Sequence, residues 1–461
     1  MKNVQLLNLQ PRSSLLIIAI LLIATSCKKD KVKEFTVDKT SFTTGTDASE
    51  QVISVNSNLE WSLVMPDDGT NWVTADKTKG AGNTSVKLSV KQNAGLDARS
   101  ATITLKSEGE NDIIITVAQK GLVDWYKGVF NFRSAKILEA ADGYVIAGEK
   151  QEKIYLCKVS KSSLAIINER VINVPGYVGG YAVDLESITE GGFILAAVVN
   201  EVANGTKSDT YIAHISSDLE VLKEKVVDKG SSRDVPGAIC PSGTGYAFAG
   251  RTDYYSFVTY FDANLYERID RYINLGNEYI HDLKTAPNGN IVGVGYMMGA
   301  KEYLVRFSPT LQMERAYISL QEGYINSLVI NPDNSLVVGG ESPGANGRFD
   351  IFCKKFDADL NPVMDQAFIL PHTGDDFNYS VIALKGGGYA LSGFGAGNGD
   401  MIGYTTRLTN RLESIPGKEI WFPVNLYSVQ AAISLEDGGY LVIGSGIESP
   451  GTQTFLVKIN P

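Results

Sequence analysis

With 461 residues, the chain is long enough for about three domains of ordinary size or for a repeat array. Hydrophobic residues make up 44% and charged residues 20%, which excludes extended disorder and a membrane protein with several spanning helices. The formal net charge is -10, from 42 Lys and Arg against 52 Asp and Glu. Phosphate binding needs a basic footprint, so this balance argues against nucleic acid as a partner. The chain has three His and four Cys, so we expect neither a cofactor nor a transition-metal site.

Residues 1–26 have the features of an export signal peptide. Lys2 and Arg12 carry positive charge, and an apolar run extends from Leu15 to Ala24. This run is too short for a membrane-spanning helix, which needs about 20 residues. The ending Ala24-Thr-Ser-Cys27 resembles the lipobox of bacterial lipoproteins, although lipoboxes usually carry Leu where Ala24 stands. The resemblance implies a lipid on Cys27, a tether at 27–32 and anchoring in the cell outer membrane; the alternative is an ordinary cleaved signal with a free Cys27.

The other three cysteines are predicted to be buried strand residues. Cys157 lies in Tyr-Leu-Cys-Lys-Val and Cys353 in Ile-Phe-Cys-Lys-Lys, so both occupy like places in strand-patterned runs. With Cys240 they make an odd number for an exported protein, and we expect no disulfide framework. A cysteine nucleophile needs an activating base, and no His neighbours any of the three in the sequence.

Residues 33–121 are predicted to form a small antiparallel β-sandwich. Runs of alternating polarity are separated by Gly, Asn and Asp, as in Gln51-Val-Ile-Ser-Val, Ala101-Thr-Ile-Thr-Leu and Ile113-Ile-Ile-Thr-Val. The order Trp61-Ser, Asn71-Trp72, Arg99-Ser-Ala-Thr-Ile and Gln119-Lys-Gly121 resembles the BACON family, named for Bacteroidetes-associated carbohydrate-binding, often N-terminal domains. The resemblance implies an immunoglobulin-like sandwich in an exported, often lipid-anchored protein of a glycan-using bacterium.

Two roles are open for this domain. It is either a spacer that holds another domain away from the membrane or a module that itself binds glycan. Trp61 and Trp72 are the candidates for stacking on a sugar, because an aromatic face suits the apolar side of a pyranose. The alternative is that both belong to the core, as a Trp in strand register usually does in so small a domain.

Residues 122–461 contain seven copies of one hairpin pattern. A turn such as Asp437-Gly-Gly precedes an anchor residue, and in six copies a Gly follows four residues after the anchor. The anchors lie 45 to 53 residues apart, close to the ~40–50 residues of one four-stranded propeller blade. The seven anchors are Tyr144, Phe193, Tyr246, Ile291, Leu336, Tyr389 and Tyr440.

The predicted fold is all-β: an immunoglobulin-like β-sandwich followed by a seven-bladed β-propeller. The last repeat lacks an outer strand, and an unmatched strand at 124–130 precedes the first repeat. We therefore expect the 124–130 strand to complete the seventh blade, which removes an open sheet edge. The repeat pattern resembles a broad class of exported bacterial propellers, which supports the fold and adds little about chemistry.

A candidate binding site is the mouth of the propeller's central channel, where the first strand of every blade begins. Counting twelve residues back from each anchor places seven residues there, five of them aromatic: Phe132, Tyr181, Asp234, Tyr279, Tyr324, Phe377 and Ser428. We interpret them as a ring that offers apolar faces and hydroxyls to a sugar or a peptide. The alternative is that the aromatic rings wedge between blades. Ser428 and the pair Arg233-Asp234 break the pattern, and individual function tends to occur at such breaks.

Other polar residues are expected on the same face. The predicted ligand-binding set is Phe132, Tyr181, Arg233, Asp234, Tyr279, His281, Tyr324, Asn326, Phe377 and Tyr379. Four nearby carboxylates offer the acid and base of a glycosidase, or a metal site together with His281 and His372, but the spacing is diagnostic of neither. These carboxylates belong to Asp234, Asp282, Asp375 and Asp376.

The sequence thus predicts a lipid-anchored protein of the cell envelope in which the sandwich lifts the propeller from the outer membrane. The channel mouth is predicted to bind a ligand, and our first hypothesis is a glycan. One alternative is a protein-interaction scaffold in an outer-membrane nutrient-uptake assembly. Another is a glycan-cleaving enzyme, which needs two carboxylates facing each other at roughly 5–10 Å.

Overall fold

The computed structural model describes residues 32–66, 71–189, 191–202, 206–273, 278–370, 374–397, 400–423, 426–448 and 451–461. All regular structure in these ranges is β-strand, so the predicted all-β class is confirmed. Within the same ranges, no helix has the length and apolar character needed to cross a membrane. The expected signal peptide and the lipid attachment at Cys27 lie outside the described residues.

The N-terminal unit is a sandwich of two sheets with the strand orders β1-β3-β7-β5 and β2-β9-β8-β4-β6. Neighbouring strands pair antiparallel, apart from the parallel pair β2 and β9. Alternate side chains of the two sheets meet in one apolar core, as the period-2 pattern of the sequence requires. The strands are β1 (Phe35–Val37), β2 (Ser41–Thr44), β3 (Ser49–Ser57), β4 (Glu60–Val64), β5 (Val73–Ala75), β6 (Lys79–Ala81), β7 (Thr84–Val90), β8 (Arg99–Lys106) and β9 (Ile113–Gln119).

Both tryptophans of the sandwich belong to its core. Trp61 is 3% exposed and Trp72 is 4% exposed. The indole N–H of Trp61 donates to the carbonyl of Gly82 at 3.2 Å, and the Arg99 guanidinium lies 4.4 Å from the centre of the Trp72 ring. Neither ring has a free face for a sugar, so the interpretation of both as core residues is confirmed.

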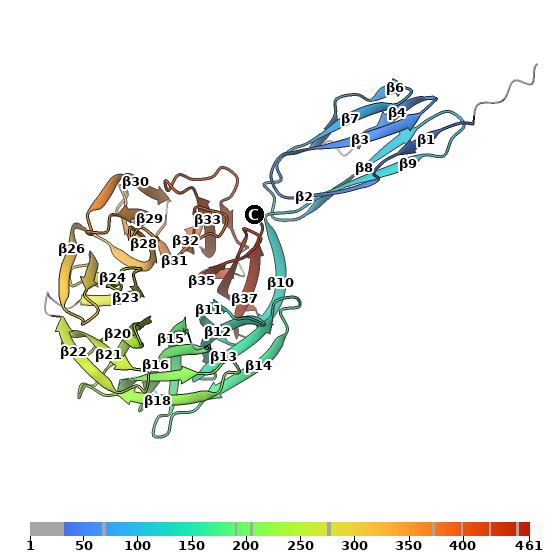
Figure 1. The fold of residues 1–461 in the computed structure, drawn as a ribbon. Helices are drawn as coiled ribbons and strands as arrows, with labels where there is room; N and C mark the ends of the chain where they lie inside the picture. Colours follow the sequence, from blue (N-terminus) through green and yellow to red (C-terminus); the bar gives the residue numbers. More distant parts are fainter. Residues whose placement is uncertain are drawn as a thin grey trace, which may run out of the picture.

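The rest of the chain forms seven four-stranded sheets that surround a central axis as the blades of a propeller (Figure 1). Blade 1 is β11 (Arg133–Glu139), β12 (Gly143–Lys150), β13 (Lys153–Ser160) and β14 (Ile166–Ile172); blade 2 is β15 (Gly179–Ser187), β16 (Phe193–Asn200), β17 (Ser208–Ile215) and β18 (Val221–Val227). Blade 3 is β19 (Val235–Ser242), β20 (Gly245–Arg251), β21 (Ser256–Asp262) and β22 (Glu267–Ile273); blade 4 is β23 (Glu278–Thr285), β24 (Ile291–Met297), β25 (Lys301–Phe307) and β26 (Met313–Glu322).

Blade 5 is β27 (Tyr324–Ile330), β28 (Leu336–Pro343), β29 (Phe349–Phe356) and β30 (Pro362–Leu370); blade 6 is β31 (Asp376–Ala383), β32 (Tyr389–Gly397), β33 (Asp400–Leu408) and β34 (Ile420–Trp421). Blade 7 combines β35 (Leu426–Ser434), β36 (Tyr440–Glu448) and β37 (Gly451–Ile459) with β10 (Val123–Phe130) from the other end of the propeller sequence. Strand β10 pairs antiparallel with β37, from Val123 opposite Ile459 onward. Strand β10 therefore covers the edge of the C-terminal strand β37 and is itself the outer strand of blade 7.

Each blade's innermost strand carries a β-bulge near its start. The register with the second strand skips one residue of the inner strand at the same place in every blade, and blade 7 also skips Tyr427. The glycine that recurs on the second strand makes this bulge possible, because a side chain there would clash with the inner strand. A Cβ at Gly295 would lie 1.7 Å from the Tyr279 carbonyl oxygen, and one at Gly393 would lie 2.0 Å from that of Phe377. The bulged residues are Ala135, Val183, Gly237, His281, Asn326, Tyr379 and Gln430.

In blades 2, 4 and 5 the residue after the bulge joins one blade to the next. The Asp184 carboxylate accepts the backbone N–H of Ile239 at 2.9 Å, and the Asp282 carboxylate accepts that of Leu328 at 2.8 Å. At the same position in blade 5, the Ser327 hydroxyl accepts the N–H of Val381 at 2.9 Å. Because each acceptor belongs to one inner strand and each donor to its neighbour, these bonds fix the blades around the channel.

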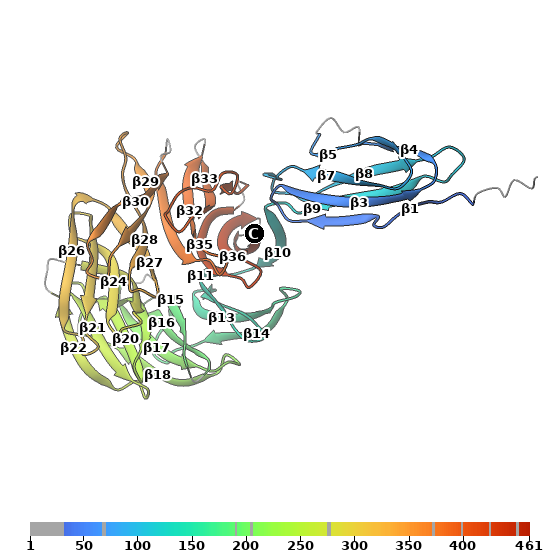
Figure 2. The ribbon, with the colours of Figure 1, turned by 45° about the horizontal axis from the view of Figure 1, so that its top comes forward.

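The sandwich contacts the propeller beside blades 6 and 7, and extends away from it (Figures 1 and 2). The buried ammonium of Lys418 donates to the Thr46 hydroxyl at 2.7 Å and to the Pro461 carbonyl at 3.0 Å, and it pairs with Asp47 at 2.9 Å. The Asn460 amide donates to the Gly121 carbonyl at 2.9 Å. Polar contacts on both sides of the connecting residues therefore hold the sandwich in one orientation.

Candidate functional site

The channel mouth is built from the starts of the inner strands and the ends of the strands next to them. The seven inner-strand residues that precede the bulge by two positions are Arg133, Tyr181, Val235, Tyr279, Tyr324, Phe377 and Ser428. Their register partners on the second strands include Glu149, Arg251, Tyr296, Glu341 and Phe394. Rings therefore gather on blades 4 to 6, and arginines on blades 1 and 3.

The rings of blades 4 to 6 form a continuous series, which we call the aromatic belt. Tyr279 stacks on Tyr296 with ring centres 4.5 Å apart and planes at 10°, and Tyr296 meets Tyr324 edge-on at 4.8 Å. The series continues through Phe349, Phe377 and Phe394 at 5.7, 6.2 and 5.0 Å, and ends at Tyr379, 5.3 Å from Phe394. Tyr379 is 44% exposed. The belt thus combines contacts between blades with an accessible ring beside the channel.

Arg251 extends the belt onto blade 3. Its guanidinium lies 4.0 Å from the centre of the Tyr279 ring, and burial lowers its pKa. Arg251, Tyr279, Tyr296 and Tyr324 line a hollow of about 310 Å³ together with Asp253. Aromatic faces, hydroxyls and a guanidinium around one hollow suit a ligand that has apolar faces and polar edges, as sugars do.

Behind the belt, a polar relay crosses three strands of blades 4 and 5. His281 Nδ1 lies 2.7 Å from Asn326 Oδ1, and the Asn326 amide donates to Glu341 at 2.8 Å. Burial lowers the pKa of His281, so its ring is neutral at pH 7 and Nδ1–H is the donor to Asn326. Burial also raises the pKa of Glu341 to about 8. The relay fixes the orientation of His281 at the mouth.

The other side of the mouth has an exposed ring, small bulge residues and two arginines. Tyr181 is 40% exposed, and the bulge residues of blades 1 to 3, Ala135, Val183 and Gly237, are small or apolar. Burial raises the pKa of Tyr181, while the charges of Arg233 and Arg133 act in the opposite direction. Both guanidiniums therefore lie near the Tyr181 hydroxyl.

Six of the ten predicted site residues come together on blades 4 to 6: Tyr279, His281, Tyr324, Asn326, Phe377 and Tyr379. Tyr181 and the exposed Arg233 lie across the mouth from them, on blades 2 and 3. The alternative that the rings pack between blades also holds for the half-buried members of the belt, because Tyr296 to Tyr324 and Phe349 to Phe377 are contacts between blades.

Two predicted site residues are wrong. Phe132 is 4% exposed and packs against Phe130 and Tyr155, with ring centres 5.9 and 4.8 Å apart. Asp234 is 0% exposed, and its carboxylate accepts from the Ser231 hydroxyl at 2.6 Å. In blades 1 and 3 the bulge is one residue closer to the conserved glycine than in the other blades, so counting back from the anchor slips by one. A slip of one residue moves a side chain to the other face of a strand.

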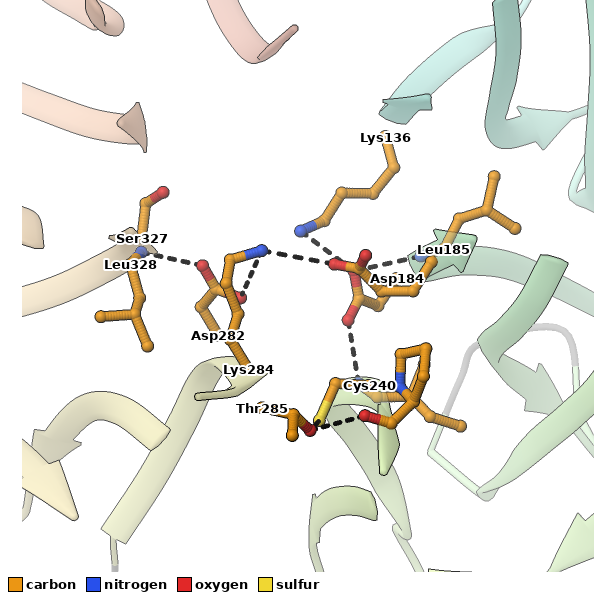
Figure 3. A network of polar contacts seen from close by, with 12 residues as sticks. Lys136, Asp184, Leu185, Cys240, Asp282, Lys284, Thr285, Ser327 and Leu328 are labelled. Carbon is orange, nitrogen blue, oxygen red and sulfur yellow. Dashed lines mark hydrogen bonds and ion pairs between the residues drawn. The ribbon is translucent and has the colours of Figure 1, made fainter. Parts of the chain in front are cut away.

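A network of charges lies across the inner strands below the mouth (Figure 3). Lys284 of blade 4 reaches Glu186 of blade 2 at 3.4 Å, past the small residues of blade 3, and also pairs with Asp282 at 3.8 Å. Lys136 of blade 1 pairs with Asp184 at 3.0 Å. Asp282 raises the pKa of Lys284, and burial raises that of Glu186. Carboxylates thus face each other across the channel, but an ammonium group lies between them.

The remaining acidic candidates are held by the protein's own donors. Asp375 pairs with Arg348 at 2.9 Å, and Asp376 is buried; His372 lies outside the described residues. Asp209, Asp228 and Asp234 have carboxylate oxygens within 4.8 Å of one another, which is compatible with a cation. In the described structure these oxygens accept hydrogen bonds from Tyr177, Gly230 and Ser231 respectively.

Sequence reasoning missed four residues of the mouth: Arg133, Arg251, Tyr296 and Phe349. Arg133 occupies the same register position in blade 1 as Tyr279 does in blade 4, and counting back from the anchor missed it by one residue. Arg251 and Tyr296 directly follow the conserved glycines Gly250 and Gly295, so the repeat alignment contained the signal for both. Phe349 opens a third strand after a loop of variable length, and no local pattern marks it.

Comparison with known proteins identifies one family. Residues 60–120 match the BACON family, described as "Putative binding domain, N-terminal". Curated proteins give no match. Among solved structures, a Bacteroides ovatus GH5 xyloglucanase in complex with a XXXG heptasaccharide is 27% identical over 21% of this chain, with a TM-score of 0.18; the chain spans 20% of that protein.

Two propeller structures cover most of the chain. The Neurospora crassa Pan2 WD40 domain is 13% identical over 71% of this chain and 89% of its own, with a TM-score of 0.47. A protein from Lactobacillus plantarum is 11% identical over 72% of this chain and 95% of its own, also with a TM-score of 0.47. The architecture itself rests on the seven sheets and their pairing.

Proposed function

We propose that this chain is a glycan-binding protein of the cell envelope and that the channel mouth is its binding face. The observation that carries the proposal is the aromatic belt, which ends in an exposed ring at Tyr379 and faces a second exposed ring at Tyr181. Exposed tyrosines give a sugar both an apolar face to stack on and a hydroxyl to bond. The neutral, oriented His281 and the amide of Asn326 add donors and acceptors at the same place.

The charged groups of the inner strands support binding at the mouth over passage through the propeller. The ion pairs of Lys284 with Glu186 and of Lys136 with Asp184 link inner strands of different blades close to the bulge residues. A ligand therefore meets a polar floor and aromatic walls, the composition of a binding cup.

In the same proposal the sandwich is a spacer, and a lipid on Cys27 anchors the protein to the outer membrane. The family description supports a binding role for this domain. Its two tryptophans are buried, however, and Lys418 fixes its orientation to the propeller. A rigid arm with no exposed tryptophan suits the task of presenting the propeller at a distance from a membrane.

The test is a glycan array followed by calorimetry on the purified mature protein and the Tyr181→Ala/Tyr379→Ala double variant. Loss of two stacking rings is expected to weaken binding by about tenfold or more, since truncating a central interface residue commonly costs more than ~1 kcal/mol. The matched control is Tyr266→Ala, which removes a 61% exposed tyrosine from the turn between β21 and β22 at the opposite end of blade 3. If no glycan binds to the folded protein, the proposal fails.

A further inference from the structure

The mouth holds three arginines without a carboxylate partner. Arg133, Arg233 and Arg251 form no ion pair with any residue that the structure describes, although the chain as a whole carries a net charge of -10. Elsewhere on the propeller some arginines pair, such as Arg170 with Glu220 at 2.9 Å and Arg348 with Asp375 at 2.9 Å, while Arg271 on an outer strand has no ion pair in the described structure. Three guanidiniums without an ion pair on one face of an acidic protein provide positive charge that an anionic ligand can neutralise.

The carboxylates nearest these arginines form no ion pair with them in the described structure. Asp253 accepts the backbone N–H groups of Ser232 and Arg233 at 3.1 and 3.2 Å. Glu149 lies opposite Arg133 in the register of β11 and β12 but forms no ion pair with it. Burial raises the pKa of Glu341 to about 8, so at neutral pH this group is mostly protonated and adds little negative potential. Below the mouth, the carboxylates form ion pairs with two lysines. The groups of this network are Asp184, Glu186, Asp282, Lys136 and Lys284.

The arginines are arranged around an exposed tyrosine. Arg133 and Tyr181 occupy the same position before the bulge in the neighbouring blades 1 and 2, and Arg233 bridges to Ser208 at the start of the third strand of blade 2. Both guanidiniums act on the Tyr181 hydroxyl. Arg133 also acts on the Tyr379 hydroxyl across blade 7, where the inner strand has only Ser428 at the mouth position. A charged group of a ligand that lies beside Tyr181 is therefore close to two guanidiniums. The next unit of that ligand can contact the ring of Tyr379.

We propose that the ligand of the mouth is an acidic glycan, with a carboxylate or sulfate group held by Arg133 and Arg233 beside Tyr181 and the adjoining sugar rings against Tyr379 and the aromatic belt. This inference rests on the proposed function and names its ligand class. Guanidinium groups present planar paired donors that match carboxylate and sulfate oxygens. Small bulge residues at Ala135, Val183 and Gly237 leave room on this side of the mouth for the charged sugar.

The test compares oligosaccharides of equal length that are carboxylated (oligogalacturonate), sulfated or neutral, by calorimetry on the mature protein. The Arg133→Gln/Arg233→Gln double variant is measured beside Arg271→Gln, which removes an exposed arginine of β22 that has no ion pair in the described structure and lies on the outer strand of blade 3. We expect the double variant to bind acidic sugars about tenfold to a hundredfold more weakly, since hydrogen bonds between charged groups are the strong ones. Arg271→Gln should bind as the parent does. Unchanged urea unfolding midpoints show that both variants are folded.

Salt dependence gives a second readout. Raising NaCl from about 0.1 M to about 1 M shortens the screening length from ~10 Å to ~3 Å, so binding of an acidic sugar should weaken in the parent and much less in the double variant. The outcomes separate the two proposals. Binding of neutral sugars only, unchanged in the double variant, overturns the acidic class and leaves the glycan-binding function standing. Equal binding of polyglutamate overturns it in favour of an acidic polypeptide. No binding of any sugar overturns both.

Discussion

Removing the carboxylate of Asp282 should destabilise the propeller more than removing the hydroxyl of Ser327, although both side chains make the same contact. Each accepts the N–H of the next inner strand, Leu328 at 2.8 Å and Val381 at 2.9 Å. In Asp282→Ala a buried N–H loses a charged acceptor, which costs about 1.5–3 kcal/mol, whereas loss of a neutral hydrogen bond costs about 0.5–1.5 kcal/mol.

The ion pair with Lys284 adds little to this difference. Its atoms are 3.8 Å apart, and the lysine side chain is 36% exposed, so solvent screening limits the pair to about 0–1 kcal/mol. We therefore expect about 2–4 kcal/mol for Asp282→Ala and about 1 kcal/mol for Ser327→Ala. Asp282→Asn keeps an acceptor for Leu328 and removes only the charge, so its cost should lie between the two.

Equilibrium unfolding in urea, followed by circular dichroism, measures all three variants under the same conditions. The midpoints should fall in the order parent, Ser327→Ala, Asp282→Asn, Asp282→Ala. If Asp282→Ala and Ser327→Ala unfold at the same urea concentration, the charge of Asp282 contributes nothing and the reasoning is refuted. If Asp282→Asn is as unstable as Asp282→Ala, the stabilisation comes from the ion pair and not from the bond to Leu328.

Three other predictions follow from buried groups. Because folding raises the pKa of Glu341 from 4.5 to about 8, the folded chain holds a proton that the unfolded chain releases, and stability should fall as the pH rises through this window. Glu341→Gln should remove this loss, on the order of a few kcal/mol, in urea unfolding at pH 5 and pH 8. Lys418→Met should weaken the contact between the sandwich and the propeller without unfolding either domain. Hydrogen exchange should then be faster at the backbone amides of Leu122 and Asn460, which lie at this junction, and unchanged exchange would contradict the prediction. The three described cysteines are buried, and burial raises their thiol pKa: Cys157, Cys240 and Cys353. A thiol reagent should therefore label none of them until urea unfolds the protein. Labelling of the native chain would contradict their burial.

The repeat pattern predicts the propeller because its local chemistry is the same in every blade. The turn at Asp437-Gly-Gly-Tyr440 has Gly438 at φ 82°, and the Asp437 carboxylate accepts the N–H of Gly439 at 3.0 Å. Tyr440 then begins β36, the strand before the C-terminal one. Such contacts lie within a few residues of one another, so periodicity alone reveals them.

The mouth was harder to predict because its contacts are distant in the sequence. A turn that is shorter by one residue is enough to exchange Arg133 for the buried Phe132, and only the strand register shows which one faces the channel. The pair of Lys284 with Glu186 joins residues 98 positions apart, past an entire blade. No spacing rule connects them, since their proximity depends on ring closure.

Stability and recognition are separated along each inner strand, and this separation makes the site testable. In blades 2, 4 and 5 the residue after the bulge accepts a hydrogen bond from the next blade, as Asp184 and Asp282 do. Blades 1, 3 and 7 have Lys136, Ala238 and Ala431 at this position. The bulged residue before it contributes to no such bond in blades 1 to 3 and varies from Gly237 to Tyr379 around the ring. A propeller can therefore change what its mouth recognises while the ring below it is maintained. Substitutions at exposed mouth positions such as Tyr379 should lose ligand and keep the fold, which allows a loss of binding to be assigned to the site itself.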